Sequence, residues 1–211
     1  MQAPFTSGES LHYEVRWSGI KAGEMILRTE NLGDNVLIEQ KTWSTGFVKA
    51  IFPMEDVFLS YLDVKEERSL LFVKHIREKK KNEITTTFFW WEEGVSWSRG
   101  KFYPLPAGAV DTLASIYVLR ASLDRLPRKL TVHDRGKSYE ILVSRAVPEK
   151  ISIAGREVRA LRVEPRAIDP SRDRDADMTI WFSTSEAHVP LKMKFSAALG
   201  SLTATLDPYC E

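Results

Sequence analysis

The feature that most constrains the fold is a strict alternation of apolar and polar residues in many short segments. In the first of these, apolar Leu11, Tyr13, Val15 and Trp17 alternate with polar residues. Successive side chains of a β-strand point to opposite faces, so this period of two predicts a strand with one dry and one wet face. Strand-like segments recur at residues 25–30, 36–43, 70–79, 83–91, 130–133, 137–143, 151–153, 158–163, 179–182, 191–195 and 201–206.

Turn residues separate these segments, most clearly at residues 31–35, 80–82 and 134–136. Many short strands joined by tight turns favour a β-barrel or sandwich over a parallel α/β fold. The chain has 211 residues, which is an ordinary length for one β domain, and it shows no linker, low-complexity tract or internal repeat. We therefore predict a mainly β protein with a single β-rich domain over residues 1–211.

One segment, starting at Asp111, breaks the alternation and predicts an α-helix that runs to about Leu123. Asp111 or Thr112 is a suitable N-cap, and Pro127 lies beyond the end. We expect its apolar face to pack against the sheet and to close one end of a barrel. That face consists of Leu113, Ile116, Tyr117 and Leu123.

Composition excludes several classes of protein. Lys and Arg number 30 against 29 Asp and Glu, so the chain lacks the basic excess of a typical nucleic-acid-binding protein. No apolar run approaches the roughly 18 residues that a membrane-spanning helix needs, and we expect no such helix. The single cysteine, Cys210, has no partner for an internal disulfide, and its position next to the C-terminus argues against a catalytic role.

A metal site is not indicated. Residues 173–177 place carboxylates at alternate positions, as a calcium loop begins, but such a loop needs Gly and then a bidentate Glu where this chain has Met178 and Thr184. A solvated, ion-paired loop is the simpler interpretation. No two histidines share a metal-ligand spacing; they are His12, His75, His133 and His188.

Catalytic motifs are also missing from the sequence. It has no G-x-S-x-G elbow and no glycine-rich phosphate loop. A Ser-His-Asp triad built from distant residues stays open, because its members need not be close in sequence. We predict no catalytic residues, no metal and no cofactor, and a protein that is not an enzyme.

Aromatic residues concentrate at Phe88, Phe89, Trp90 and Trp91, and Trp97 follows soon after. Alternation places Phe88 and Trp90 on one face of a strand and Phe89 and Trp91 on the other. Both faces are therefore apolar, and each needs a cover. Core packing is the ordinary explanation; a groove for an apolar ligand and a patch for a protein partner are the functional alternatives.

Two further segments have functional interpretations. Residues 47–54 are apolar and include Pro53, which suggests an edge strand or a flexible flap, with Met54 and Phe58 lining an entrance. Residues 79–81 are three consecutive lysines at a hairpin tip. The tip is either simply solvated or makes weak contacts with anionic lipid headgroups or nucleic acid.

The sequence resembles a bacterial exported-protein family known only as a domain of unknown function. The resemblance covers nearly the whole chain, and the helix beginning at Asp111 is similar to the family's central segment. The residues that carry it are Phe5, Gly8, Glu9, Leu11, Tyr13, Val15, Trp17, Gly19, Ala22, Gly23, Leu113, Tyr117, Leu119, Arg120, Trp181, Ser183, Pro190, Leu191, Gly200 and Leu206.

The resemblance implies a periplasmic protein with a large, curled antiparallel sheet, an open barrel or β-spiral, wrapped around one central helix. That shape is similar to envelope proteins that carry or sense lipids and lipoproteins. Residues 1–4 fit a start methionine on a mature N-terminus after signal-peptide removal, with a native cytosolic start as the alternative. The family supplies no catalytic residues.

These observations lead to two functional hypotheses. The first is a non-catalytic envelope protein that holds a lipid-like ligand or a lipoprotein in the curled sheet. The second is a scaffolding domain, filled by its own side chains, that docks an envelope protein partner; a hydrolase is a distant third. Nucleic acid is not expected as a partner. The residues expected to bind the ligand are Phe52, Phe58, Trp90, Trp97 and Tyr117.

Overall fold

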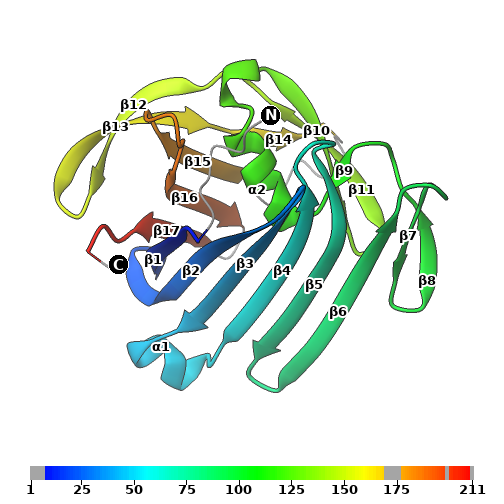
Figure 1. The fold of residues 1–211 in the computed structure, drawn as a ribbon. Coiled ribbons are helices and arrows are strands. Elements are labelled where there is room, and N and C mark those ends of the chain that lie inside the picture. The colour runs from blue at the N-terminus through cyan, green and yellow to red at the C-terminus, as the bar shows by residue number, and fades with distance from the viewer. Residues whose placement is uncertain (1–7, 169–176, 198–199, 210–211) are drawn as a thin grey trace.

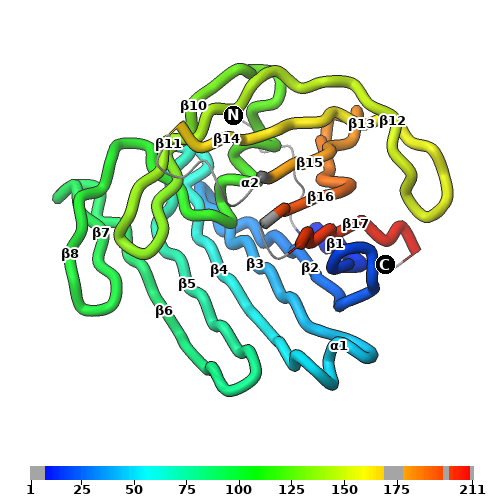
Figure 2. The backbone as a smooth tube through the Cα atoms, turned by 180° about the vertical axis from the view of Figure 1, so that it is seen from behind, coloured from blue at the N-terminus to red at the C-terminus, as the bar shows by residue number. Residues whose placement is uncertain are grey.

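A computed structural model describes residues 8–168, 177–197 and 200–209, and its main feature is one antiparallel sheet of 13 strands. The sheet curls around helix α2 (Thr112–Arg120) (Figure 1). Its two end strands, β8 and β12, stay apart, so the sheet does not close into a barrel (Figure 2). The predicted fold class, a large curled antiparallel sheet around one central helix, is confirmed.

Eight strands, consecutive in the chain, form the larger part of this sheet, and each pairs with the next. They are β1 (Ser10–Trp17), β2 (Ile20–Leu32), β3 (Asn35–Ser44), β4 (Glu55–Asp63), β5 (Arg68–Glu78), β6 (Lys81–Trp90), β7 (Val95–Ser98) and β8 (Lys101–Pro104).

The rest of the large sheet comes from the C-terminal part of the chain, where β17 pairs with β1. The order outward from β1 is β17 (Gly200–Leu206), β16 (Pro190–Ala197), β15 (Asp177–Ser183), β13 (Arg156–Val163) and β12 (Val147–Ile153).

A second, four-stranded sheet lies beside the helix, and the sequence pattern did not predict it. Its order is β14-β11-β10-β9, and β9 runs parallel to β10. Nothing in the alternation of a single strand says which sheet the strand joins. The members are β9 (Ala109–Val110), β10 (Arg128–Asp134), β11 (Lys137–Val143) and β14 (Pro165–Ala167).

Helix α2 starts as predicted and ends slightly early. Asp111 is its N-cap, and the carboxylate accepts hydrogen bonds from the backbone N–H groups of Leu113 and Ala114. The helix ends at Arg120, and a 3-10 turn (Leu123–Arg125) follows. Its side chains at Leu113 and Tyr117 are at most 2% exposed, in a core shared with both sheets.

The segment 47–54 was predicted to be an edge strand or a flexible flap, and the edge-strand alternative is wrong. Residues Gly46–Ile51 form a short helix, α1, and β4 begins soon after it. The backbone N–H of Thr45 donates to the carbonyl of Ala22, which sets α1 against β2. Continuous apolar residues without alternation are compatible with either structure over so short a stretch.

Candidate functional site

The inner face of the large sheet, which faces α2, is held to the helix by a buried carboxylate. The Ser60 and Ser69 hydroxyls donate to Asp111 Oδ2 at 2.6 and 2.7 Å. Burial raises the pKa of the Asp111 carboxyl, against the opposing effect of these hydrogen bonds. Asp111 thus links the start of α2 to β4 and β5.

The other end of α2 is held by a buried ion pair. Both terminal nitrogens of Arg120 donate to the Glu9 carboxylate at 2.6 and 2.8 Å, and Arg120 Nε donates to the Ala187 carbonyl at 2.6 Å. Nearby, the Tyr13 hydroxyl donates to the Pro190 carbonyl at 2.8 Å. Glu9, Tyr13, Arg120 and Pro190 all carry the family resemblance. Glu9 and Arg120 anchor the helix, and the Tyr13–Pro190 bond joins β1 to the start of β16.

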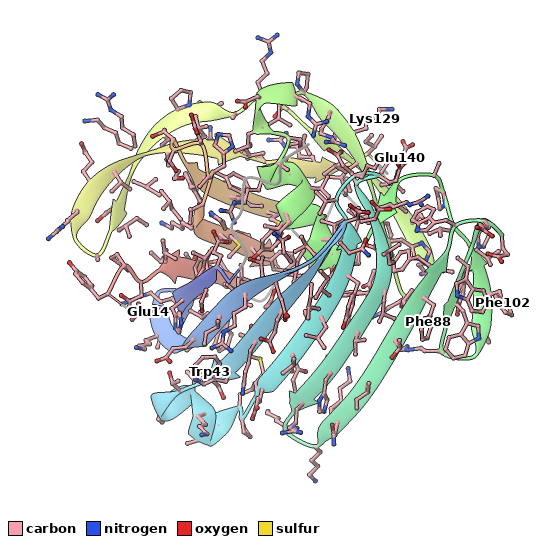
Figure 3. All side chains as sticks on the ribbon, viewed as in Figure 1. Glu14, Trp43, Phe88, Phe102, Lys129 and Glu140 are labelled. Carbon is pink, nitrogen blue, oxygen red and sulfur yellow. The ribbon has the colours of Figure 1, made fainter. Side chains whose placement is uncertain are left out.

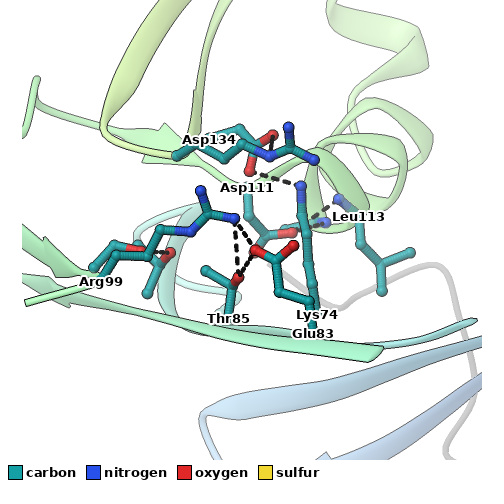
Figure 4. Close-up of polar contacts among 11 residues, drawn as sticks. Lys74, Glu83, Thr85, Arg99, Asp111, Leu113 and Asp134 are labelled. Carbon is teal, nitrogen blue, oxygen red and sulfur yellow. Dashed lines mark hydrogen bonds and ion pairs between the residues drawn. The ribbon is translucent and has the colours of Figure 1, made fainter. Parts of the chain in front are cut away.

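A histidine between two serines is the arrangement closest to a catalytic group. His133 Nε2 lies 2.7 Å from Ser96 Oγ, and His133 Nδ1 lies 2.8 Å from Ser138 Oγ. Burial lowers the pKa of His133, and Asp134 opposes that shift. The Asp134 carboxylate binds Lys74 Nζ at 2.6 Å (Figure 4). Both ring nitrogens have serine partners, so no carboxylate orients the imidazole as in a hydrolase triad. Ser96 and His133 are also at most 1% exposed, which keeps them away from a substrate in solution.

Metal ligands do not converge in the part of the chain that the structure describes. No group of three or more His, Cys, Asp and Glu side chains there could hold an ion. The candidate calcium loop at residues 173–177 lies almost wholly outside the described residues. Among the described residues, no helix is long and apolar enough to cross a bilayer.

The five residues expected to bind a ligand lie in separate places. Tyr117 is in the core, 1% exposed, and Phe58 is half-buried on the inner face of β4, edge-on to Phe72. Phe52 follows α1 and is 37% exposed. Trp90 and Trp97 both lie on the outer face of the sheet, which points away from α2.

That outer face carries a continuous apolar surface, because cross-strand neighbours share a face. Its longest row crosses six strands, and two shorter rows flank it. The long row is Leu37, Tyr61, Leu71, Phe88, Trp97 and Phe102. The flanking rows are Trp90, Val95 and Pro104 on one side and Leu59, Val73 and Thr86 on the other. We call these three rows the outer aromatic face.

Four aromatic side chains lie together at the β6–β8 end of the outer aromatic face. The Phe88 and Trp97 rings lie 5.8 Å apart, and the Trp90 and Phe102 rings lie 5.4 Å apart. Phe88, Trp90 and Phe102 are 38%, 41% and 60% exposed. Phe88 and Phe102 stand at the β6–β8 end of the sheet (Figure 3). The predicted split of the strand is confirmed: Phe89 lies on the inner face and is 5% exposed.

No residue of the outer aromatic face is charged. A more polar pocket of about 360 Å³ lies elsewhere, where α1 meets the outer sides of β2 and β3; its lining includes Arg28, Glu39, Lys41 and Glu55. Charged linings of this kind suit polar molecules. The outer aromatic face therefore suits an apolar partner better than this pocket does.

Sequence reasoning identified Trp90 and Trp97 but missed their partners across the strands. The hairpin turns determine which residues face each other across neighbouring strands. A two-residue turn at Lys79 and Lys80 sets Leu71 opposite Phe88, and a turn at Arg99 and Gly100 sets Trp97 opposite Phe102. Alternation within each strand, combined with these two registers, would have found the Leu71–Phe88 and Trp97–Phe102 pairs.

Three comparisons place the chain among known proteins. A family model described as "Protein of unknown function (DUF3108)" matches residues 12–207. No curated protein matches the chain. The solved structure of a β-barrel-like protein of the domain of unknown function DUF1849, from Brucella abortus, matches with a TM-score of 0.63. That match covers 94% of each chain at 10% sequence identity, so the likeness concerns the fold alone.

Proposed function

The chain belongs to the DUF3108 family of proteins of unknown function, and from that premise we propose that it is a non-catalytic envelope protein that binds a lipid-like ligand on its outer aromatic face. Membership confirms the resemblance to a domain of unknown function. The single observation that carries the proposal is the uncharged aromatic surface across β3 to β8, left bare by the rest of the described chain.

Burial of this surface supplies the binding energy. Removing apolar area from water stabilises by about 25 cal/mol per Å², and fixing a flexible ligand offsets part of it. The three rows present mostly carbon atoms, and the backbone groups beneath them pair with neighbouring strands. An acyl chain needs no hydrogen-bond partner, so this surface suits it better than it suits a polar ligand.

The periplasm is the proposed compartment, on the basis of the sequence resemblance to exported proteins. Acyl chains there belong to membrane lipids and lipoproteins, which gives the proposed ligand a source. A free fatty acid, a lysophospholipid and the lipid of a lipoprotein present the same chain to the protein and differ in their headgroups.

Native mass spectrometry of the purified protein tests the proposal, with laurate and a lysophospholipid as probes. The wild type is expected to carry a mass in the lipid range or to take up a probe, with a rise in melting temperature. Trp90→Thr/Phe102→Thr is expected to lose that uptake, since both side chains are exposed and Thr suits a strand.

Matched variants decide where the ligand binds. Leu142→Thr changes a side chain of similar exposure, 45%, on the separate small sheet and is expected to bind as the wild type does. Leu202→Thr changes a 47% exposed side chain on β17, opposite Trp17. Loss of binding in Leu202→Thr but not in Trp90→Thr/Phe102→Thr would move the ligand away from the outer aromatic face and refute the proposal.

A scaffolding role is the second candidate, and the shape of the same surface favours it. Small-molecule sites are concave, whereas the long row crosses six strands of one sheet face, as a protein interface does. Sedimentation velocity over a range of concentrations tests the simplest partner, a second copy. Self-association that Trp90→Thr/Phe102→Thr abolishes, without uptake of either probe, would favour this candidate over the first.

A further inference from the structure

We propose that one edge of the molecule, formed by α1 and the β5–β6 tip, docks onto the surface of an anionic lipid membrane. This basic edge consists of Phe47, Ile51 and Phe52 with Lys49, Lys79 and Lys80. It is separate from the outer aromatic face, and its role does not depend on the function proposed above.

The apolar part of the basic edge is unusually exposed. Helix α1 has no buried residue, and Phe47, Ile51 and Phe52 are 78%, 59% and 37% exposed. A helix that packs on a core would turn such side chains inward. Exposed Phe and Ile on a short segment are instead typical of side chains that enter the boundary between lipid headgroups and acyl chains.

The charged part of the basic edge has a single sign. Lys49, Lys79 and Lys80 are exposed, and none of them forms an ion pair among the described residues. Of the neighbouring acidic groups, Glu55 pairs with Lys41 and Arg77, and Glu83 pairs with Arg99. Glu78, which precedes Lys79, is half-buried. The basic edge therefore offers free positive charge beside apolar side chains.

Backbone contacts hold the two parts together. The N–H of Lys79 donates to the carbonyl of Pro53 at 2.9 Å, and Met54 bridges to Glu78. Lys79 Nζ also lies 4.8 Å from the centre of the Phe52 ring. Figure 1 shows α1 and the β5–β6 tip at the same end of the sheet. The basic edge is thus one preformed surface and not two independent loops.

Charge complementarity selects an anionic bilayer as the occupant. Lysines near such a surface attract it, and apolar side chains add binding only where hydrocarbon is within reach. A nucleic acid would use the lysines but would leave the α1 side chains in water. The lipid surface is the partner that uses both halves of the basic edge.

Co-sedimentation with vesicles tests this proposal. Wild-type protein is expected to bind mixed phosphatidylcholine–phosphatidylglycerol vesicles, to bind phosphatidylcholine vesicles far less, and to dissociate as salt is raised. Lys79→Glu/Lys80→Glu is expected to weaken binding by roughly 30-fold, since each lysine lost accounts for about fivefold near an anionic surface. Phe47→Ser/Ile51→Ser is expected to weaken it by at least about tenfold.

Two control variants change residues outside the basic edge. Lys129→Glu/Lys137→Glu alters net charge equally, and Lys129 lies at the opposite end of the molecule from α1 (Figure 3). Both this variant and Trp90→Thr/Phe102→Thr are expected to bind vesicles as the wild type does, which keeps failure of this proposal distinct from failure of the ligand proposal. All variants change exposed residues, and melting temperatures confirm that each is folded.

Three results would overturn the proposal. They are no binding of the wild type to mixed vesicles, equal loss in the Lys129→Glu/Lys137→Glu control, and full binding by both basic-edge variants. Binding of a single-stranded DNA oligonucleotide through Lys79 and Lys80, with no vesicle binding, would assign the lysines to nucleic acid instead.

Discussion

At the scale of residues, buried polar side chains fix how the helix and the sheets meet. Asp111 and His133 are at most 1% exposed, and each holds at least two hydrogen-bond partners. Buried polar groups of this kind contribute modestly when paired and are costly when a partner is removed. They therefore specify the packing of the structure more than they add to its stability.

Asp111→Ala is expected to lower the free energy of unfolding by about 3 kcal/mol. The change removes the N-cap of α2 and leaves the Ser60 and Ser69 hydroxyls without their acceptor. Urea denaturation measures the effect, with Thr112→Ala, an exposed neighbour, as the control that stays within about 0.5 kcal/mol of wild type. Equal effects in the two variants would contradict the assigned role.

His133 makes the stability of the protein depend on pH. Burial lowers its pKa in the folded state, so the unfolded chain takes up the proton more readily. Stability from neutral His133 is fully present above the unfolded pKa of about 6.5 and is lost as pH falls below it. Denaturation at several pH values between neutral and mildly acidic is expected to show a steeper loss for wild type than for His133→Gln. Parallel curves would show that His133 is not the cause.

At the scale of elements, helix α2 is tied to the sheet at both ends, and its C-terminal end depends on Arg120. Arg120 is fully buried, and its partners come from residues 9 and 187, at opposite ends of the chain. Its guanidinium also lies 5.9 Å from the Tyr117 ring centre. Contacts this distant in sequence join the N-terminal segment and the loop before β16 to the helix.

Arg120→Ala is expected to destabilise the protein by about 3–5 kcal/mol, because it leaves the Glu9 carboxylate close to the core without its cation. Arg120→Ala/Glu9→Gln is expected to recover part of that loss, since it removes the uncompensated charge. Thermal or urea denaturation of both variants provides the comparison. A double variant less stable than the single one would argue against a charge-based penalty.

Sequence reasoning predicted the elements better than their assembly. Alternation located most strands, and the N-cap signal at Asp111 located α2, because both are local properties of the chain. Helix α1 was not predicted, since its segment was expected to be an edge strand or a flexible flap, and the small sheet with its parallel β9–β10 pair was missed. The small sheet depends on contacts between distant residues, which local patterns do not encode. A short apolar stretch without alternation, such as that of α1, is compatible with helix and strand alike.

The candidate site was predicted only in part for the same reason. Trp90 and Trp97 were identified from their local concentration, and the structure sets them on one face. Tyr117 has the same aromatic chemistry but serves the core, because its helix turns it toward the sheets. Aromatic residues in the sequence thus indicate apolar surface. Whether that surface is buried or exposed depends on how the strands and helices are arranged.

At the scale of the whole molecule, the curled sheet separates two kinds of apolar surface. Its inner face is covered by α2 and the small sheet, while the outer aromatic face and the basic edge remain exposed. Different tryptophans lie on the outer face, on the inner face and beside α1. Trp90 and Trp97 lie on the outer aromatic face, Trp43 lines the pocket beside α1, and Trp91 donates from the inner face to the Ser69 carbonyl.

Fluorine NMR of protein labelled with 5-fluorotryptophan therefore tests the central claim most directly. Titration with laurate below its micelle concentration is expected to shift the Trp90 and Trp97 signals, each assigned by substitution, and to leave Trp91 and Trp43 unchanged. A shift of Trp91 with Trp90 and Trp97 unmoved would place the ligand inside the curl and contradict the account.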